Sequence, residues 1–239
     1  MQRELTLWGI EKGQSTEFRA FEEEEYSRGF RLIAGVDEVG RGPLAGPVVA
    51  AAVVLPRAYS NSEIRDSKLL SIKQRERLAP LIQNHAVEYA LGIVQAEEID
   101  QFNIHQASLL AMVKGLAGLN AKPDCALIDG NQAIPMTVFR MGEFIDGRTV
   151  HQKLIIKGDR SCLSIAAASI IAKVARDALM VEYDKRYPEY GFADHKGYGC
   201  AEHLEALRRY GPSPIHRRSF KPVREALPQQ KNHGPLFEA

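Results

Sequence analysis

The stretch that decides the fold is GVDEVGRGPLAGPVV, residues 35–49. It places two acids, Asp37 and Glu38, side by side at the end of an apolar run, and a glycine-rich turn follows them. An ionised carboxylate is costly to bury unless it is paired or binds a cation. Neither acid suits the interior of a strand, so we expect a positive group to bind between them.

The segments around this stretch have the pattern of an α/β protein. Residues 31–37 and 47–55 are apolar and joined by a short turn, which predicts a hairpin, and residues 86–94 alternate as a third strand. Residues 124–130 and 153–159 each predict a buried strand that ends on an aspartate. Helices are predicted at residues 17–28, 73–83, 96–102, 105–119, 162–186 and 201–210. Three strands come first, and strands and helices then alternate along the chain. This order indicates a mixed sheet with helices on its faces.

The composition indicates an ordinary globular protein. The chain has 239 residues, of which 45% are hydrophobic and 26% charged, enough for one large domain. A net charge of +1 means that any anion-binding surface must come from local clustering. Its three cysteines form no CxxC pair, which argues against a disulfide framework and a structural zinc site. We expect a cytoplasmic protein without membrane contact, since no signal peptide or membrane span is visible.

Three predicted strands end on or near an acid. Asp37 with Glu38 follows the first strand, and Asp129 and Asp159 end two later ones. Functional groups of open α/β sheets gather at strand ends, so these four carboxylates converge if the strands are neighbours. Oxygen ligands without thiolates suit Mg²⁺ or Mn²⁺. Two such ions ~3.5–4 Å apart can activate a water and stabilise the leaving oxygen of a phosphodiester.

Some of these acids also have a purely structural interpretation. Asp129 precedes Gly130 and can be a turn residue. Asp159 stands two residues before Ser161 and a long helix, so it can be part of a turn or a cap. Asp146 is a fifth candidate, in EFIDGR, and looks like another turn acid.

Seven motifs together resemble the type 2 ribonuclease H family, which includes bacterial ribonuclease HII. They are GVDEVGRGPLAGPVV, DSKLL, LIDGN, KGDRS, AAASIIAKVARD, YGFADHKGY and HRRSF, in order from Ile33 to Val223. The resemblance implies a ribonuclease H-like α/β fold: a five-stranded mixed sheet with flanking helices plus a C-terminal helical segment. The implied organisation is an N-terminal arm with a short helix (1–30), a catalytic core (31–190), a substrate-binding helical segment (191–221) and a flexible tail (222–239).

The resemblance also implies an activity. Family members hydrolyse the RNA strand of RNA–DNA hybrids and incise DNA 5′ of single embedded ribonucleotides, leaving 3′-hydroxyl and 5′-phosphate ends, with two Mn²⁺ or Mg²⁺ ions. By motif, Asp37, Glu38, Asp129 and Asp159 are the catalytic, metal-binding acids. The interval between the last two is longer here than in most bacterial members. Counting by the usual interval would select Asp146, but Asp159 keeps its flanking KGD motif and directly precedes the long helix.

Substrate contacts are expected from two loops. The Gly40-Arg41-Gly42 turn allows the backbone to approach a sugar and to bond the 2′-hydroxyl that distinguishes RNA from DNA. Tyr198 resembles the family tyrosine that packs against the sugar after the cleavage junction. The candidate phosphate contacts are Lys68, Lys173, Arg176, Lys196, Arg217 and Arg218. Each cation is also consistent with a solvated surface charge.

Three alternatives stay open at this point. A type 3 ribonuclease H would carry an extra N-terminal domain, for which residues 1–30 are too few. A catalytically dead hybrid-binding module would have lost one of the four acids. The tail is either simply disordered, or Leu236 and Phe237 dock it on a sliding clamp. We expect a monomer, and we expect His195 and His203 to have loop and surface roles, since neither has a second ligand at metal-binding spacing.

Overall fold

The computed structural model describes residues 17–141 and 150–227. Its strands are β1 (Ile33–Val39), β2 (Val48–Val54), β3 (Glu88–Val94), β4 (Cys125–Asp129) and β5 (His151–Ile155). They form one sheet in the order β3-β2-β1-β4-β5. Strand β2 runs antiparallel to both of its neighbours, β1 and β3, whereas β4 runs parallel to β1 and β5 runs parallel to β4. The predicted five-stranded mixed sheet is confirmed.

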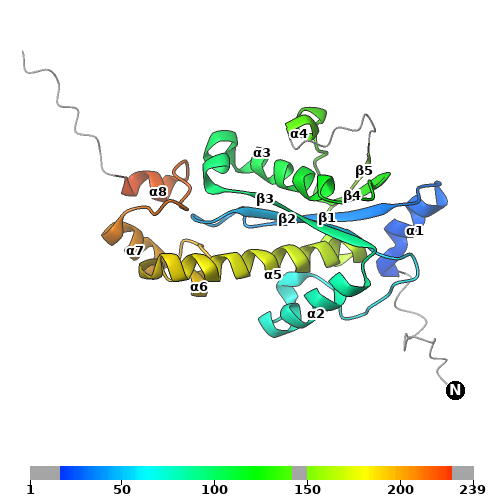
Figure 1. The fold of residues 1–239 in the computed structure, drawn as a ribbon, viewed down its shortest axis with the longest axis horizontal. Coiled ribbons are helices and arrows are strands. Elements are labelled where there is room, and N and C mark those ends of the chain that lie inside the picture. The colour runs from blue at the N-terminus through cyan, green and yellow to red at the C-terminus, as the bar shows by residue number, and fades with distance from the viewer. Residues whose placement is uncertain (1–16, 142–149, 228–239) are drawn as a thin grey trace, which may run out of the picture.

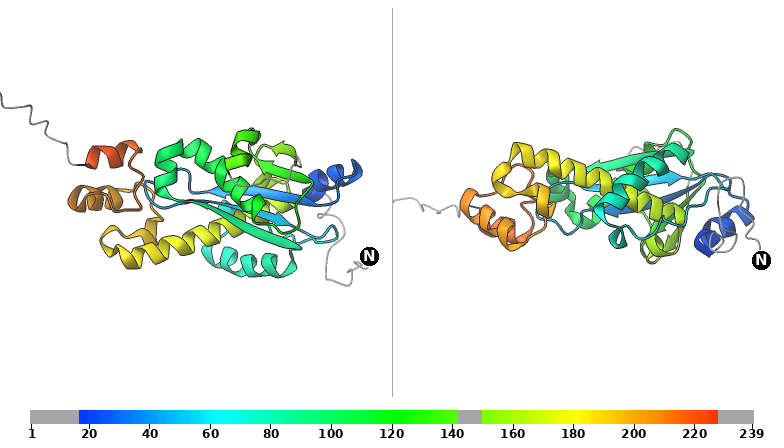
Figure 2. Two further views of the ribbon diagram at one scale, coloured as in Figure 1. Left: turned by 45° about the horizontal axis from the view of Figure 1, so that its top comes forward. Right: turned by 90° about the horizontal axis from the view of Figure 1, so that it is seen from below.

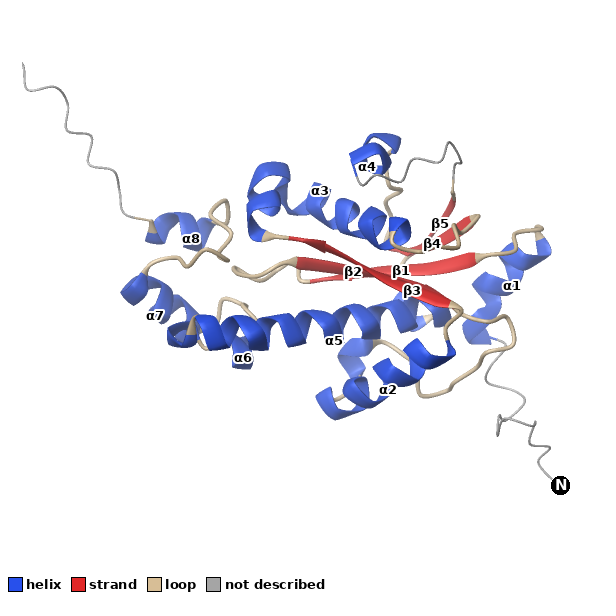
Figure 3. Cartoon of the chain, in the orientation of Figure 1, coloured by secondary structure: helices blue, strands red, loops and turns tan. Residues whose placement is uncertain are grey.

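Helices cover both faces of this sheet, as Figures 1 and 3 show. They are α1 (Ala20–Ser27), α2 (Ile72–His85), α3 (Ala96–Ala117), α4 (Met136–Met141), α5 (Leu163–Arg186), α6 (Phe192–His195), α7 (Ala201–Tyr210) and α8 (Lys221–Ala226). Helices α3 and α4 lie on one face, and α5 and α2 lie on the other. Helices α6, α7 and α8 gather beyond one end of the sheet, and α1 lies at the opposite end (Figure 2). None of the helices in the described ranges is long and apolar enough to cross a bilayer.

Strand β1 is buried from Ile33 to Asp37 and half-buried at its last two residues. Val36 packs into the core under α3, whereas Ile33 packs into a separate core with Ile165 of α5. Gly35 lets α5 approach very closely, since a Cβ there would lie 2.2 Å from the Ser164 carbonyl carbon. The small side chains of α5 therefore set this helix directly against the strand that carries the first two acids.

One strand boundary differs from the sequence prediction. Strand β5 ends at Ile155, and Asp159 lies beyond it in the short 3-10 helix η3 (Gly158–Arg160), so this aspartate does not end a strand. The two helices predicted at 96–102 and 105–119 correspond to the two halves of α3, which a kink at Asn103 separates, where φ is +66°. The Asn103 Oδ1 accepts hydrogen bonds from the amides of His105 and Gln106, which caps the second half of α3.

The C-terminal boundary also needs correction. A flexible tail from residue 222 is wrong for its first residues, because residues 221–226 form α8 and Val223 is fully buried. Phe220 and Ala226 flank the same small core, which anchors the end of the helical segment. Residues 1–16, Asp146 and the tail from 228 onward, with Leu236 and Phe237, lie outside the described residues.

Candidate active site

The four predicted acids come together where β1 and β4 end, with Asp159 in the turn that follows β5. Asp37 on β1 and Asp129 on β4 follow the paired residues Val36 and Ile128, so they lie side by side on the face covered by α5. The backbone N–H of Gly158 donates to Asp129 Oδ1 at 2.7 Å, which places the Asp159 turn beside the third acid. Asp37 and Asp159 are 5% and 4% exposed, so both carboxylates are shielded from bulk water.

The charges of these acids are poorly compensated. Burial, followed by the charges of Glu38 and Asp129, raises the pKa of Asp37 well above its ordinary value. Burial also raises the pKa of Asp129, with a contribution from Asp159. The pKa of Glu38 is raised by burial against the lowering effect of Arg41, which donates to it at 3.2 Å. Mutually repelling carboxylates of this kind favour a bound cation.

Two neighbouring serines and a lysine support the acids. Ser169 of α5 lies beside Asp37 and acts to lower the pKa of that carboxyl, and its Oγ lies 2.9 Å from Ser67 Oγ. Lys68 Nζ lies 3.3 Å from Asp159 Oδ2. Burial acts to lower the pKa of Lys68, but Asp159 and the other nearby carboxylates raise it on balance. The sequence prediction included Lys68 and missed both serines.

The turn that carries Lys68 is tied to the turn that carries the fourth acid. Asp66 caps the short 3-10 helix η2 (Ser67–Leu69) by accepting the Lys68 amide at 2.9 Å. Its second oxygen accepts a hydrogen bond from Arg160 Nε at 2.9 Å, and Asp66 is 1% exposed. Because Arg160 follows Asp159 directly, this ion pair between a buried aspartate and an exposed arginine joins the two turns.

The donor set fits hard divalent cations. All four acids offer oxygens and no thiolate, as Mg²⁺ and Mn²⁺ prefer. Within the described ranges, only Glu25, Cys125 and His151 bring one ligand atom each within 4.8 Å of one another. That group does not suit a cation, because Lys153 Nζ already binds Glu25 at 2.9 Å and burial raises the pKa of Cys125 to about 12. The four acids are spaced more widely, consistent with their repulsion.

A buried arginine holds the Gly40-Arg41-Gly42 loop from beneath. Arg217 Nη2 donates to the Gly40 carbonyl at 2.6 Å, Nη1 donates to the Arg41 carbonyl at 3.0 Å, and Nε donates to the Gly46 carbonyl at 3.0 Å. Its exposed fraction is 0%. Burial lowers the pKa of Arg217 to about 9, which keeps the guanidinium charged at neutral pH. The prediction that Arg217 contacts phosphate is therefore wrong.

A second buried arginine joins this loop to the loop of Tyr198. Arg176 of α5 donates from Nε to the Pro47 carbonyl at 3.0 Å, from Nη2 to the Ala45 carbonyl at 3.2 Å and from Nη1 to the Lys196 carbonyl at 3.0 Å. It is also 0% exposed, so its prediction as a phosphate contact is wrong. In the part of the chain that the structure describes, neither buried arginine has a carboxylate within ion-pair distance.

The two predicted sugar-reading loops meet. A Cβ on Gly42 would lie 3.4 Å from Cε1 of Tyr198, whose side chain is 45% exposed. Gly40 has a φ of +94°, and a Cβ there would lie 2.2 Å from Arg176 Nε, so only glycine fits. Arg41 and Gly42 are both exposed residues, and across residues 17–141 and 150–227 no group accepts a hydrogen bond from their amides.

One face of α5 runs beneath both parts of the site. Ser169, Lys173, Arg176 and Met180 follow one another at helical spacing: Ser169 supports Asp37, and the last two lie under the loop. Lys173 lies between them, with Nζ 2.7 Å from Asp177. Of the remaining predicted phosphate contacts, Lys196 donates to the Ala193 carbonyl and Arg218 is exposed.

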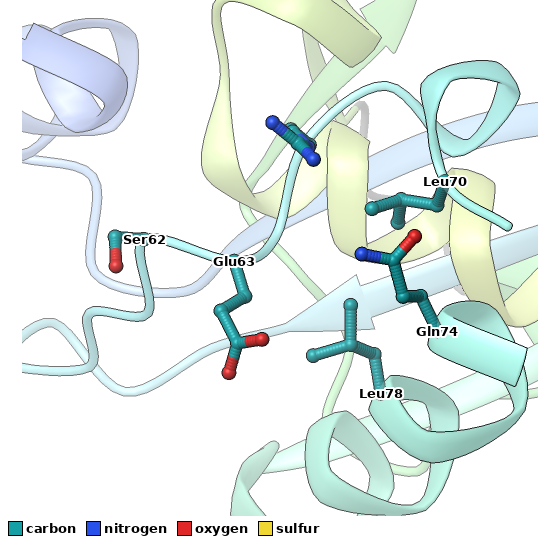
Figure 4. Close-up of a pocket in the computed structure, with 6 residues that line it drawn as sticks. Ser62, Glu63, Leu70, Gln74 and Leu78 are labelled. Atoms are coloured by element: carbon teal, nitrogen blue, oxygen red, sulfur yellow. The ribbon is translucent and has the colours of Figure 1, made fainter.

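The pocket in Figure 4 is separate from the acids. It lies between the loop before η2 and helix α2, and its volume is about 160 Å³. The lining residues are Ser62, Glu63, Arg65, Leu70, Gln74 and Leu78. This volume is smaller than the ~300–1,000 Å³ typical of small-molecule sites. The acids instead lie at the ends of strands beside exposed loops, an arrangement suited to a large substrate.

A five-stranded mixed sheet, helices on both faces and acids at the ends of neighbouring strands define the ribonuclease H-like fold. The sequence model of the family Ribonuclease HII matches residues 34–223. A curated Ribonuclease HII from Syntrophotalea carbinolica is 49% identical over 207 residues, which cover 87% of this chain and 93% of that protein. The chain belongs to the ribonuclease HII family. It is a metal-dependent ribonuclease H, a hydrolase of phosphodiester bonds that acts on the RNA of RNA–DNA hybrids.

Solved structures agree with this assignment. The ribonuclease H2 from Pyrococcus horikoshii superposes with a TM-score of 0.68 and is 28% identical, covering 82% of this chain and 97% of that chain. A chain of the PCNA:RNase HII complex from Archaeoglobus fulgidus gives a TM-score of 0.61 at 26% identity, covering 80% of this chain and 96% of that one. The family match therefore favours the type 2 enzyme over the type 3 alternative.

Proposed function

We propose that this enzyme incises DNA duplexes 5′ of a single embedded ribonucleotide, in addition to cutting longer hybrids, and leaves 3′-hydroxyl and 5′-phosphate ends. The observation that carries the proposal is that Gly42 faces the Tyr198 ring, with space for no more than a methyl group between them, beside the cluster of acids. One loop is built for close approach to a ribose, and the other presents an exposed ring to the adjoining sugar. Single-ribonucleotide incision requires that a ribose and a neighbouring deoxyribose be recognised together.

Asp37, Glu38, Asp129 and Asp159 are the proposed ligands of two Mg²⁺ or Mn²⁺ ions. When bound, such ions would supply an activated water and stabilise the leaving 3′-oxygen of the phosphodiester. The chain's own residues set the geometry: Ser169 orients Asp37, and the Gly158 amide orients Asp129. The raised pKa values of Asp37, Glu38 and Asp129 support this role, because each carboxylate gains from a neighbouring cation.

The ribose is read by the backbone of the glycine loop. Arg217 occupies the carbonyl oxygens of Gly40 and Arg41. The amides of Arg41 and Gly42 are left as donors, and a 2′-hydroxyl oxygen can accept from them. A deoxyribose offers no such oxygen, so this contact selects the ribonucleotide.

The neighbouring sugar packs against the Tyr198 ring, and crowding there favours a 2′-deoxy sugar. Lys68 and Lys173 are the proposed phosphate contacts, since Lys68 lies beside Asp159 and Lys173 lies on the α5 face between the acids and the loop. Such contacts position the duplex without reading its sequence. All the proposed ligands come from one chain, so the enzyme can act as a monomer.

The test is incision of a DNA duplex that carries one ribonucleotide, with Mg²⁺ or Mn²⁺ and with a chelator, alongside an all-DNA duplex and a long hybrid. We expect a metal-dependent cut 5′ of the ribonucleotide and none in all-DNA. Cutting of the hybrid without cutting of the single ribonucleotide would contradict the proposal. A folded protein that binds both substrates but cuts neither would support a hybrid-binding module instead.

A second proposal concerns the C-terminal tail. We propose that Leu236 and Phe237 dock the enzyme on a sliding clamp, because the Archaeoglobus fulgidus relative forms a complex with PCNA. Deleting residues 228–239 should weaken binding to the clamp and leave incision of free duplex unchanged. Unchanged clamp affinity would remove this proposal.

A further inference from the structure

Two buried histidines lie beneath the Tyr198 loop, where the sequence predicted loop and surface roles. His203 of α7 is 0% exposed and His216 is 1% exposed, so the surface prediction is wrong for His203. His203 Nε2 lies 3.0 Å from His216 Nε2. His203 Nδ1 lies 2.9 Å from the carbonyl oxygen of Tyr198, and His216 Nδ1 lies 2.9 Å from the amide nitrogen of Ser213.

These contacts determine where each proton lies. A carbonyl can only accept, so His203 Nδ1 carries a hydrogen and donates it to Tyr198. An amide N–H can only donate, so His216 Nδ1 is unprotonated and accepts from Ser213. A neutral His216 then carries its proton on Nε2 and donates it to the bare Nε2 of His203. The Ser213 amide and the Tyr198 carbonyl therefore fix opposite tautomers on the two histidines. Each hydrogen bond in this series is donated in the direction of Tyr198.

The surroundings hold both rings in the neutral form. His195 stacks on His203 with ring centroids 4.6 Å apart, and the Phe192 ring meets His203 edge-on at 5.4 Å. The Tyr190 ring lies 4.9 Å from His216. Burial, with the charge of His195, lowers the pKa of His203, and burial lowers that of His216 to about 3. A second proton on either ring would set two N–H groups against each other.

The anchored carbonyl belongs to the residue whose ring faces the glycine loop. The Tyr198 carbonyl also accepts from the Cys200 amide at 2.9 Å, so the peptide is held by two donors. The preceding Gly197 carbonyl accepts from the Leu44 amide at 2.8 Å, which attaches this loop to the glycine loop. A peptide fixed this firmly restricts where the ring can lie relative to Gly42.

We propose that His203 is a positioning residue that fixes the Tyr198 ring for reading the deoxyribose after the cut, with His216 fixing the His203 tautomer. This inference rests on the proposed function of Tyr198. His203 does not touch the substrate. It acts by donating one hydrogen bond to the backbone of the residue that does.

Two substitutions separate the two hydrogen bonds of His203. An asparagine amide can take the place of Nδ1–H, so His203→Asn keeps the donor to Tyr198 and loses the contact with His216. A glutamine amide reaches the Nε2 position, so His203→Gln loses the donor to Tyr198. Each variant is assayed on two duplexes that differ only in a deoxyribose or a ribose after the junction. The readout is the ratio of the two kcat/KM values, together with the melting temperature.

We expect His203→Gln to reduce this ratio on the order of tenfold or more, towards the value of Tyr198→Ala, because small misplacements of a contact group are costly. His203→Asn should keep most of the discrimination. In the double variant of His203→Gln and Tyr198→Ala, the two losses should not add. Equal ratios in wild type and in a folded His203→Gln would overturn the inference. Failure of the wild type to discriminate would instead defeat the proposed role of Tyr198.

The tautomers give a readout that needs no activity. Long-range ¹H–¹⁵N spectra of the full chain at neutral pH should show His203 protonated on Nδ1 and His216 protonated on Nε2. His203→Asn should leave the His216 tautomer unchanged, because the Ser213 amide still donates to Nδ1. The same tautomer on both rings, or a charged ring at pH 7, would overturn the inference even if His203→Gln does not fold.

Discussion

Arg217 Nη2 lies 2.6 Å from the carbonyl oxygen of Gly40, a residue 177 positions earlier in the chain. This hydrogen bond joins the C-terminal helical segment to the loop that follows Asp37 and Glu38. The inner side of this loop is therefore part of the packed interior. On its outer side Arg41 and Gly42 are exposed, and we propose that their amides bind the substrate.

Replacing this arginine tests the support of the loop. Arg217→Lys keeps the charge but loses the fork that binds three carbonyls at once. We expect kcat/KM on the single-ribonucleotide duplex to fall by about 10–100-fold, since the loop amides are displaced. The matched control is Arg208→Lys on α7, an exposed residue paired with Glu205, which should cut like wild type. Normal cutting by Arg217→Lys would show that the charge alone suffices.

The two glycines of the loop should respond differently to alanine. Gly40→Ala forces a side chain into a φ of +94° and onto Arg176, so we expect about 1–3 kcal/mol of lost stability. Gly42→Ala meets only the Tyr198 ring at an ordinary 3.4 Å, so stability should stay within about 0.5 kcal/mol. Its methyl group occupies the approach to the sugar, so KM should rise. Urea denaturation and steady-state kinetics measure both; a destabilised Gly42→Ala would contradict the described contact.

The fourth acid is tested by paired amide substitutions. Asp159→Asn should reduce kcat on the order of 10²-fold or more, because a ligand of the proposed ions loses its charge. Asp146→Asn, which changes a residue outside the described ranges, should retain activity. The assay is single-turnover incision in Mn²⁺ and in Mg²⁺. If Asp146→Asn lost activity and Asp159→Asn kept it, the fourth metal ligand would be Asp146, in the extra residues before β5.

Replacing Asp37 should increase the stability of the protein and abolish its activity. Its carboxylate is buried beside the charges of Glu38 and Asp129. Asp37→Asn removes that repulsion, so without divalent ions we expect a gain of about 0.5–2 kcal/mol in the free energy of unfolding, together with loss of cutting. Chemical denaturation in chelating buffer measures the gain. The control is Asp194→Asn, an exposed residue of α6, for which no gain is expected. A destabilised Asp37→Asn would mean that the Ser169 bond outweighs the repulsion.

Acid should weaken the fold through the histidine pair. The pKa of His216 is about 3 in the folded protein against an ordinary 6.5, so below pH 6.5 the unfolded chain binds more protons than the folded one. The contribution of His216 to the free energy of unfolding is therefore complete above pH 6.5. It falls as the pH drops toward 3, by up to about 1.4 kcal/mol per pH unit. The midpoints of urea denaturation at pH 7.5 and pH 5 measure this loss of stability. The difference between the two midpoints should be smaller in His216→Asn than in wild type, and His85→Gln, at an exposed site, should match wild type.

The apolar pattern predicted the sheet well, because β1, β2 and β4 are apolar runs bounded by turns and β3 alternates. The acids were found for the same reason: a carboxylate at the end of a buried strand is conspicuous. Arg176 and Arg217 were misassigned because a buried cation and a phosphate contact look alike in sequence. Their partners are backbone carbonyls far along the chain, which no local pattern reveals. The role of His203 likewise depends on His216, thirteen residues away across a turn.

The α5 face described above has a consequence for where the enzyme cuts. Ser169 lies beside an acid that we propose binds metal, and Arg176 holds the loop that we propose reads the ribose. Seven positions along one α-helix separate these two residues, a rise of about 10.5 Å that cannot stretch without breaking backbone hydrogen bonds. On the proposed function, helix α5 therefore fixes the distance between the phosphodiester that is cut and the ribose that is read.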